Sequence, residues 1–480
     1  MHELVKVIIE EIRRLQDSPQ PWGDMDDPLP RLIGAGDGRL IPVSRKVDQL
    51  IADIARRKMK GNAMLESRFT GKDFREMVRR AFGPALIKID HERDVDQNAA
   101  FVLNDVEEAV TREVEWISEK GQREYAFGCT LFSYDDVAPF DVGPVRFEPR
   151  KVWLDRKASD GRWVRVTPDG RLERFPERIA DGPISKVAKH RILHTWQGYK
   201  LKKRKPSTDS REEQHVLKAI GCCLYVCSVK VPGFGGEAGQ EKAVISARLA
   251  LAAVALLWEA PSTALNGFNL RAGRELRDHE VLSFTADGLV LGGGGGSKRS
   301  HAHWVRRDEL EEILKRSAEN FAVAGEAISS FLDPTEGSAR PKLMNAVVHT
   351  LLWFYEGCCE TVPQIALVKF SAAMEVLTGK LSRKGSQEAI RKLIKANLGV
   401  DDDKVITRDG MTMKEFIELI YGKGRNRMIH GENEALGHDW STWRAAAEKL
   451  ARDCIVLYMN RIAENPSIND PKQLLQHASG

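Results

Sequence analysis

The chain has 480 residues, of which 42% are hydrophobic and 30% are charged, and its formal net charge at pH 7 is +4. This length exceeds one ordinary hydrophobic core and suggests about three domains, and the composition excludes a disordered chain in favour of a soluble globular protein. The small net charge neither favours nor excludes a nucleic acid as partner, because the basic residues are unevenly distributed along the sequence.

Short sequence features exclude several further classes of protein. The seven cysteines show no disulfide framework, so we expect reduced thiols in a cytosolic protein. Cys222, Cys223 and Cys227 lack the C-x2-C spacing of a zinc site, and we expect no metal and no other cofactor. The longest apolar run, residues 249–258, is much shorter than the ~20 residues that span a bilayer. With no secretory signal visible, the sequence predicts a cytoplasmic protein that does not engage a membrane.

Residues 1–120 predict a helical N-terminal region. Residues 1–17 interrupt their apolar positions with charges at helical spacing, and residues 17–37 are rich in Pro, Gly and Asp, which is typical of an irregular connection. Helical periodicity returns after Ser44, a residue suited to capping a helix, and recurs in a long helix over residues 99–120.

Residues 121–335 predict a mixed α/β middle region, with a break near residue 206 between two units. Short β-rich segments separated by Asp-Gly turns indicate a small antiparallel sheet in the first unit. The glycine run at 292–296 lacks the Gly-Lys-Ser/Thr ending of a Walker phosphate loop, which favours a flexible surface loop. The predicted strands cover residues 127–133, 145–147, 151–154, 162–166, 222–231, 281–284 and 289–291, and the predicted helix covers residues 243–259.

A basic segment leads out of the first unit. Between Lys186 and Lys205 there are eight Lys or Arg and no Asp or Glu, with Trp196 and Tyr199 interleaved. Basic residues beside aromatic ones suit phosphate neutralisation and base stacking, so the segment is a candidate RNA-binding surface; an exposed solvated loop is the alternative. The candidate RNA contacts are Lys200, Lys202, Lys203, Arg204 and Lys205.

Residues 336–466 predict a helical bundle, and residues 467–480 a flexible tail. Apolar stripes recur at spacings of about 3.6 residues in three segments of this region. Trp440 and Trp443, in the third stripe, favour core or dimer contacts over base stacking. The expected fold class is therefore α+β and predominantly helical, with an all-α C-terminal bundle behind a β-containing middle region.

The segment Gly422 to Gly431, which reads Gly-Lys-Gly-Arg-Asn-Arg-Met-Ile-His-Gly, carries the candidate catalytic residues Arg425, Asn426 and His430. We expect the two leading glycines to let the chain turn, so that Arg425 opens a new helix whose unpaired N–H groups suit a phosphate. At about 100° per residue, Asn426 and His430 share a helix face, so Asn426 is predicted to orient the imidazole, while Arg425 and His430 stand about 140° apart. The structural alternative is a hydrogen-bonded helix histidine and a solvated arginine.

Residues of roughly 344 to 464, about a quarter of the chain, resemble a HEPN domain of the Apea-like kind. The resemblance rests on the helix Phe370-Ser-Ala-Ala-Met-Glu-Val-Leu377, on Tyr421 ahead of Arg425-Asn-x-x-x-His430-Gly431, and on a long final helix. It implies metal-independent RNA cleavage by a homodimer or higher homo-oligomer, with motifs from two subunits in one cleft. It also implies a role in defence against phage or as a toxin. HEPN domains that only bind nucleotides or partners usually lack the Arg or His that this chain keeps.

The residue types of the motif suit RNA cleavage. RNA supplies its own nucleophile, the 2′-hydroxyl, so a nuclease needs an acid or base near neutral pKa and a cation for the phosphorane charge. His430 fits the first role and Arg425 the second. Glu375 is a possible supporting residue, because it lies where it could meet Arg425 or His430 across the bundle; a solvated face position is the alternative.

The expected function is a metal-independent RNA endonuclease, with transfer RNA as one candidate substrate and a phage-derived molecule or a partner protein as the trigger. The alternative is a non-catalytic RNA- or nucleotide-binding protein that acts as a sensor or scaffold. Loss of cleavage in His430→Ala, with the fold and the dimer intact, distinguishes the first from the second.

Overall fold

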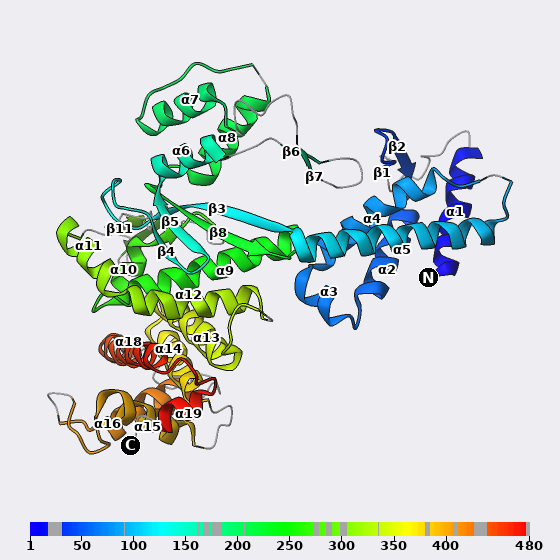
Figure 1. The fold of residues 1–480 in the computed structure, drawn as a ribbon. Helices are drawn as coiled ribbons and strands as arrows, with labels where there is room; N and C mark the ends of the chain where they lie inside the picture. Colours follow the sequence, from blue (N-terminus) through cyan, green and yellow to red (C-terminus); the bar gives the residue numbers. More distant parts are fainter. Residues whose placement is uncertain are drawn as a thin grey trace. The chain divides into compact units, whose positions relative to one another are not determined.

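The computed structural model divides into two compact units, each held together by its own contacts. Unit 1 comprises residues 1–123, 156–190 and 231–242, and unit 2 comprises residues 124–155, 191–230 and 243–480. The predicted fold class is confirmed: the chain is mostly helical, with antiparallel sheets in the middle region and a helical C-terminal part (Figure 1). The structure describes residues 1–17, 31–90, 92–160, 164–166, 172–174, 184–205, 207–272, 278–284, 290–297, 305–334, 336–379, 385–406, 410–426 and 439–476.

Unit 1 contains a helical core in which α1 packs on α5, α2 on α4, and α4 on α5. The predicted helices over residues 1–17 and 99–120 are confirmed, and the Ser44 side chain accepts a hydrogen bond from the Val47 amide at 3.3 Å as the N-cap of α2. Val47, Ile51 and Ile54 of α2 all face this core. The helices are α1 (His2–Asp17), α2 (Arg45–Met59), α3 (Ala63–Arg68), α4 (Gly71–Leu86) and α5 (Val95–Lys120).

The prediction of an irregular connection over residues 17–37 is wrong for residues 31–34, which form one strand of a hairpin in unit 1. Strand β1 (Arg31–Gly34) pairs antiparallel with β2 (Leu40–Val43), while residues 18–30 lie outside the described part of the chain. The hairpin packs closely on α4, because a Cβ added to Gly83 would lie 1.8 Å from the Gly34 carbonyl oxygen. Ile33 is buried in the same core, so tertiary packing stabilises a strand where composition suggested a loop.

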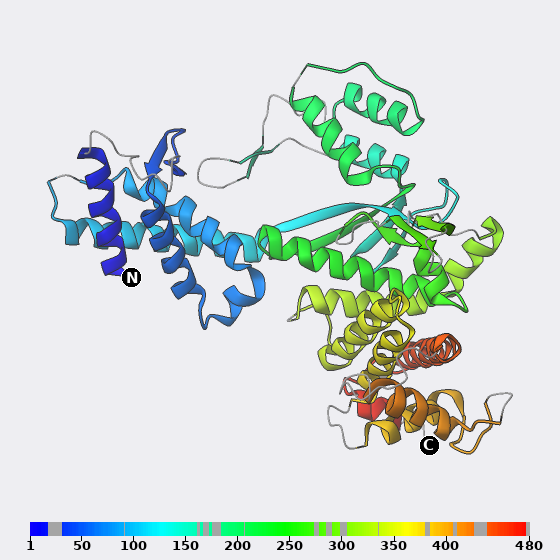
Figure 2. The ribbon, with the colours of Figure 1, turned by 180° about the vertical axis from the view of Figure 1, so that it is seen from behind.

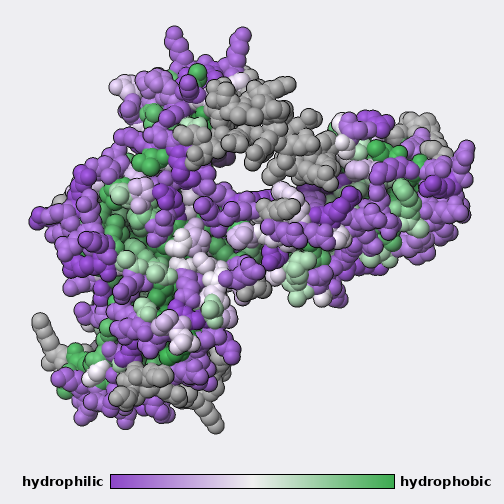
Figure 3. All heavy atoms as spheres, viewed as in Figure 1, coloured by the Kyte–Doolittle hydropathy of each residue, from purple (hydrophilic) through white to green (hydrophobic). Residues whose placement is uncertain are grey.

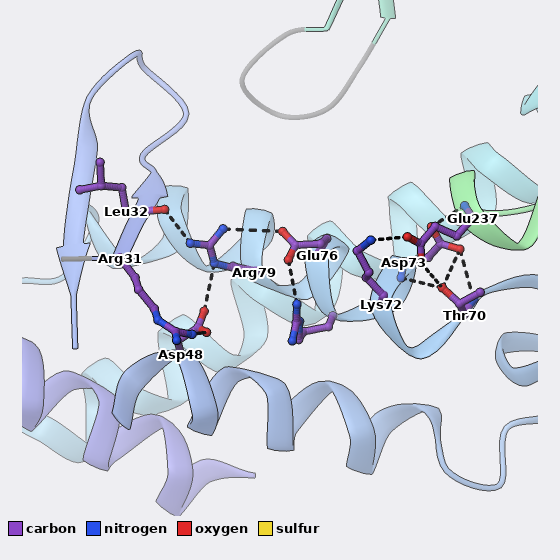
Figure 4. A network of polar contacts seen from close by, with 10 residues as sticks. Arg31, Leu32, Asp48, Thr70, Lys72, Asp73, Glu76, Arg79 and Glu237 are labelled. Atoms are coloured by element: carbon purple, nitrogen blue, oxygen red, sulfur yellow. Dashed lines mark hydrogen bonds and ion pairs between the residues drawn. The ribbon is translucent and has the colours of Figure 1, made fainter. Parts of the chain in front are cut away.

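A polar network in unit 1 joins α4 to the first turn of α9 (Gly236–Ala255), as Figure 4 shows. The Asp73 carboxylate closes the capping box of α4 by accepting from the Thr70 amide at 3.2 Å. The same carboxylate accepts from the Glu237 amide at 2.9 Å and the Ala238 amide at 3.0 Å. One side chain therefore caps two helices, and Lys72 pairs with Glu237 beside it.

Unit 2 contains a five-stranded sheet with the strand order β4-β5-β8-β3-β9. Its pairs β4–β5, β5–β8 and β3–β9 are antiparallel, and Phe147 of β5 lies opposite Cys227 of β8. In Figures 1 and 2, helix α9 runs along this sheet, and its side chains from Leu249 to Ala255 are all buried. The strands are β3 (Gln122–Thr130), β4 (Phe140–Val142), β5 (Val145–Pro149), β8 (Tyr225–Pro232) and β9 (Asn269–Leu270).

Two predictions for the middle region are wrong. Residues 151–154 belong to α6 (Arg150–Asp160) and not to a strand; the adjacent Trp153 and Leu154 are both buried, which suits a helix face and not the alternation of a strand. The glycine run 292–296 lies in β11 and not in a loop. Backbone groups alone form an antiparallel ladder, so missing side chains do not prevent the pairing. The two-stranded sheets are β6 (Val164–Val166) with β7 (Leu172–Arg174), and β10 (Asp278–Phe284) with β11 (Val290–Ser297).

The C-terminal bundle of unit 2 surrounds α14, which contacts α13, α15, α18 and the π-helix η2. Helix α12 packs against α13 and α18, and all three helices belong to unit 2, while the domain boundaries near residues 206 and 335 stay predictions. The helices are α10 (Pro261–Gly267), α11 (Arg307–Arg316), α12 (Ala318–Leu332), α13 (Pro341–Cys358), α14 (Pro363–Leu377), α15 (Ser386–Leu398), α16 (Met413–Ile417), η2 (Glu418–Asn426), α18 (Ser441–Glu464) and α19 (Pro471–Gln476).

The prediction of a flexible tail over residues 467–480 is wrong for Pro471–Gln476, which form α19. This short helix contacts α13, and its Leu474 is 1% exposed, so an apolar anchor holds it against the bundle. Residues 477–480 lie outside the described part of the chain.

Hydrophilic residues predominate on the face of the molecule in Figure 3. Across the described ranges, no helix combines the length and the apolar character that crossing a membrane requires.

Candidate functional site

A polar cluster within the C-terminal bundle contains Arg425 and the carboxylate of Glu375. Nη2 of Arg425 lies 2.9 Å from Oε2 of Glu375, so the predicted contact between these two residues is present. Tyr421 donates its hydroxyl to the same oxygen at 3.1 Å, and Ser386 donates to Oε1 at 2.7 Å. Three donors from two helices, α15 and η2, therefore converge on one carboxylate of α14. The side chains of Arg425 and Glu375 are only 20% and 14% exposed.

Tyr421 is held in its protonated form within this cluster. Burial raises its pKa above the ordinary value of 10.0, although the Ser386 hydrogen bond and the Arg425 charge act in the opposite direction. The guanidinium of Arg425 lies over the Tyr421 ring, 4.5 Å from its centroid, and also donates to the Tyr421 hydroxyl. The arginine is thus fixed on its face by the ring and at its end by a carboxylate.

The helix that carries Arg425 differs from the prediction. Helices α16 and η2 run without a break from Met413 to Asn426, so Arg425 does not open a new helix, and the expected N-terminal phosphate site at this position is absent from the described residues. Gly424 lies inside this helix and not at a turn, and it is buried against α14, where an added Cβ would make an ordinary contact of 3.4 Å with Cδ1 of Leu367.

The segment η2 is a π-helix, and this corrects the predicted angles as well. A π-helix bonds residue i to i+5, so a rotation of about 100° per residue does not apply to Glu418–Asn426. Tyr421 and Arg425, four positions apart, meet on one face of η2. π-Helical turns are rare and concentrate at functional sites, so η2 is a structural indicator independent of the sequence motif.

The other motif residues are only partly described. Asn426 is the last residue of η2, and its side chain lies outside the described part, as do His430 and Gly431. Of the two tryptophans, Trp440 is 8% exposed and the ring of Trp443 lies 6.2 Å from that of Phe416, in agreement with the predicted core contacts.

The candidate RNA-binding segment follows helix α7 (Lys186–Trp196) and precedes α8 (Thr208–Ile220). Of the five basic residues predicted to contact RNA, the four lysines are exposed. Arg204 differs, since it is half-buried and its Nη1 lies 3.2 Å from Glu213 of α8. Trp196 is covered by Arg150, whose guanidinium lies 4.9 Å from the ring centroid, whereas Tyr199 is 61% exposed. The four exposed lysines are Lys200, Lys202, Lys203 and Lys205.

Sequence reasoning missed Ser386 and Glu213. Ser386 follows a left-handed glycine at the start of α15, and no local pattern indicates that it reaches Glu375. Glu213 of α8 lies outside the acid-free segment 186–205 and reaches it through ion pairs with Arg191 and Arg204. Both contacts join residues of different helices, so no periodicity along the chain reveals them.

No group of three or more potential metal ligands gathers within the part of the chain that the structure describes. No protein-family model matches the sequence, and searches of curated proteins and of solved structures found no match either.

Proposed function

We propose that this protein is a metal-independent RNA endonuclease of the HEPN type, acting in the cytoplasm as a homodimer in phage defence or as a toxin. The observation that carries the proposal is the fixed Arg425, held by Glu375 and Tyr421 on a π-helix that leads into the motif Arg425-Asn-x-x-x-His430. A guanidinium positioned in this way is suited to a phosphate, because its planar fork binds two oxygens at once.

The proposed reaction is an internal transesterification. The 2′-oxygen attacks the adjacent phosphorus, the bond to the 5′-oxygen breaks, and the products carry a 2′,3′-cyclic phosphate and a 5′-hydroxyl. His430 removes the proton from the 2′-hydroxyl or delivers one to the leaving 5′-oxygen, and Asn426 orients its ring. Arg425 stabilises the charge that develops on the phosphorane oxygens.

Glu375 fits this scheme as a positioning residue. It accepts from Tyr421, Ser386 and Arg425, so it sets the direction of the guanidinium without contacting the RNA. Nε of Arg425 is buried and has no hydrogen-bond partner among the described residues. A twofold-related subunit would supply the second half of the cleft.

The competing proposal is a non-catalytic RNA- or nucleotide-binding protein. The ion pair between Arg425 and Glu375 favours it, because a paired arginine carries less net positive charge toward a phosphate. In that case the bundle serves as a sensor or scaffold and no RNA is cut.

The test uses purified wild type, His430→Ala and Arg425→Ala, incubated with total RNA and with transfer RNA in EDTA. His349→Ala is the matched control, because His349 is an exposed histidine on α13 of the same bundle. Discrete fragments ending in 2′,3′-cyclic phosphate from wild type and the control, but from neither motif variant, support the nuclease. Light scattering of each variant checks that the dimer is intact.

Unchanged cleavage in His430→Ala would contradict the proposed role of this residue. Retention of intact RNA by wild type and His430→Ala alike, under conditions where the trigger is supplied by phage-infected cell extract, would favour the binding protein instead.

A further inference from the structure

An open concavity of about 670 Å³ lies between the C-terminal part of α7, the segment that follows it and α8. Its lining includes Tyr199, Lys200, Lys202 and Lys203. Within the described part of the chain, Glu213 is the acidic residue of this lining, and its charge is shared by two arginines. The surface of the concavity is therefore strongly positive.

Two arginines of the concavity, Arg191 and Arg204, hold its lining together by binding Glu213. Glu213 is 10% exposed in its side chain and lies 2.9 Å from Nε of Arg191 and 3.2 Å from Nη1 of Arg204. Arg191 also donates from Nη2 to the Lys202 carbonyl at 2.9 Å. These contacts fix the backbone between the two helices, so the lysines project from a segment that is already ordered before any ligand binds.

The lysines of the concavity remain available to a ligand. Lys200, Lys202 and Lys203 are exposed, and no ion pair of these side chains occurs among the described residues. Three ammonium groups within four positions of chain match a ligand with regularly spaced negative charges. An isolated anion would engage one of them, whereas a phosphate backbone engages all three.

An aromatic face accompanies these charges. Tyr199 is 61% exposed, and its ring centroid lies 5.2 Å from that of His194, at an interplanar angle of 40°. The histidine supports one side of the tyrosine and leaves the other toward solvent. An exposed ring beside a basic groove is the combination by which proteins bind single strands, since an unpaired base stacks on the ring while cations follow the backbone.

We infer that this concavity binds single-stranded RNA, with Lys200, Lys202 and Lys203 on successive phosphates and Tyr199 under a base. The choice of RNA over other single strands rests on the proposed nuclease function; the single-strand preference rests on the exposed Tyr199. The concavity is distinct from the Arg425 cluster, because it belongs to α7 and α8 and not to the C-terminal bundle. It therefore holds the substrate and takes no part in the chemistry.

The test measures binding of a labelled 20-nucleotide single-stranded RNA by fluorescence anisotropy, in the 480-residue chain carrying His430→Ala so that the probe is not cleaved. One variant adds Lys200→Gln, Lys202→Gln and Lys203→Gln. The matched control adds Lys60→Gln, Lys315→Gln and Lys342→Gln, which removes the same charge from three other exposed lysines. A second pair compares Tyr199→Ala with Tyr199→Phe.

We expect the concavity variant to lose affinity roughly 10- to 100-fold at 0.1 M salt, and its slope of log affinity against log salt to fall in magnitude by about 2, since each phosphate contact to a single strand contributes about 0.7. The control should keep the slope of the parent protein. Tyr199→Ala should weaken binding roughly 5- to 100-fold and Tyr199→Phe little, because phenylalanine retains the stacking face.

Equal slopes in the concavity variant and the control would overturn the inference. Tighter binding of a duplex of the same sequence would overturn the single-strand assignment, and equal binding of single-stranded DNA would overturn the assignment to RNA. Cleavage measured on the same substitutions in the wild-type background separates the two proposals. If wild type cleaves RNA but the concavity variant binds RNA as well as its parent, the nuclease proposal is supported and the RNA-binding inference is contradicted. If the concavity variant loses binding but wild type does not cleave, the RNA-binding inference is supported and the nuclease proposal is contradicted.

Discussion

Glu375 and Arg425 lie 50 positions apart in the sequence, yet Oε2 of one is 2.9 Å from Nη2 of the other. Glu375 belongs to α14, the central helix of the C-terminal bundle, and Arg425 to the π-helix that packs on it. The contact joins the only motif arginine whose side chain the structure describes to the bundle core. It makes the position of Arg425 depend on the fold and not on the local sequence.

Replacing the carboxylate should reveal how much this contact stabilises the bundle. Glu375→Ala removes the carboxylate that Tyr421, Ser386 and Arg425 share as an acceptor, and we expect it to lower the free energy of unfolding by about 1–3 kcal/mol. Glu388→Ala is the control, because Glu388 forms a surface ion pair with Lys392 that is worth less than about 1 kcal/mol. If urea titrations give the same loss of free energy of unfolding for both variants, the stabilising role of the buried carboxylate is contradicted.

The identity of the cation at position 425 should matter for cleavage. Arg425→Lys keeps the charge but loses both the planar fork and the stacking on Tyr421, so we expect cleavage to fall by about tenfold or more. Arg316→Lys, at a surface position on α11 whose side chain is 70% exposed, should leave the rate unchanged. Circular dichroism checks the fold of both, and full activity of Arg425→Lys would show that charge alone suffices.

Close packing of β4–β5 on α12 depends on two glycines. A Cβ added to Gly325 would lie 2.6 Å from Cα of Gly143, which itself has a left-handed φ of +59°. We expect Gly325→Ala to destabilise unit 2 by about 1–3 kcal/mol, seen as a lower melting temperature. Gly71→Ala has open space around the new Cβ and should be neutral or slightly stabilising. If both variants lower the melting temperature equally, the steric explanation is contradicted.

The capping role of Asp73 predicts a pH dependence. Burial raises its pKa, but hydrogen bonds from Glu237, Ala238 and Thr70 together hold the folded-state pKa below the ordinary 3.8. The stabilisation is therefore complete above pH 3.8 and is lost as the pH falls through the folded-state pKa. Asp73→Ala should lower the free energy of unfolding by about 1–2 kcal/mol at pH 7. The difference in melting temperature between Asp73→Ala and wild type should become smaller below pH 3.8.

The control for this pH dependence is Asp53→Ala, which removes a carboxylate that is 42% exposed and pairs with Arg56 within α2. It should shift the melting temperature little at any pH. If the difference in melting temperature between Asp73→Ala and wild type stays constant down to the lowest pH, the charge of the carboxylate does not contribute to stability.

Thiol chemistry should distinguish the exposed cysteine from the buried ones. Cys222 is exposed, whereas burial raises the pKa of Cys223 to about 11 and that of Cys454 to about 12. We expect iodoacetamide at pH 8 to label Cys222 first, as mapped by mass spectrometry, and Cys222→Ser to remove this fast reaction. Equally fast labelling of Cys454 in the native protein would mean that the bundle core opens readily.

The sequence by itself determined the features that depend on local periodicity and composition. The apolar stripes predicted the bundle helices, Ser44 marked the start of α2, and the lysines of residues 200–205 marked an exposed basic surface. These predictions hold because capping, helix amphipathicity and lysine solvation are decided within a few residues of chain.

Only the tertiary structure decided which distant residues meet. The packing of α14 on η2 brings Glu375 to Arg425, and the tertiary structure also pairs Glu213 of α8 with Arg191 of α7. Local signals also failed where other contacts decided: Gly424 lies inside a continuous helix and is buried against α14, and the glycine run 292–296 forms a strand because β10 supplies its backbone partners. Contacts between separate elements carry free energies that no local pattern encodes, so they reverse local preferences wherever burial and backbone pairing are stronger.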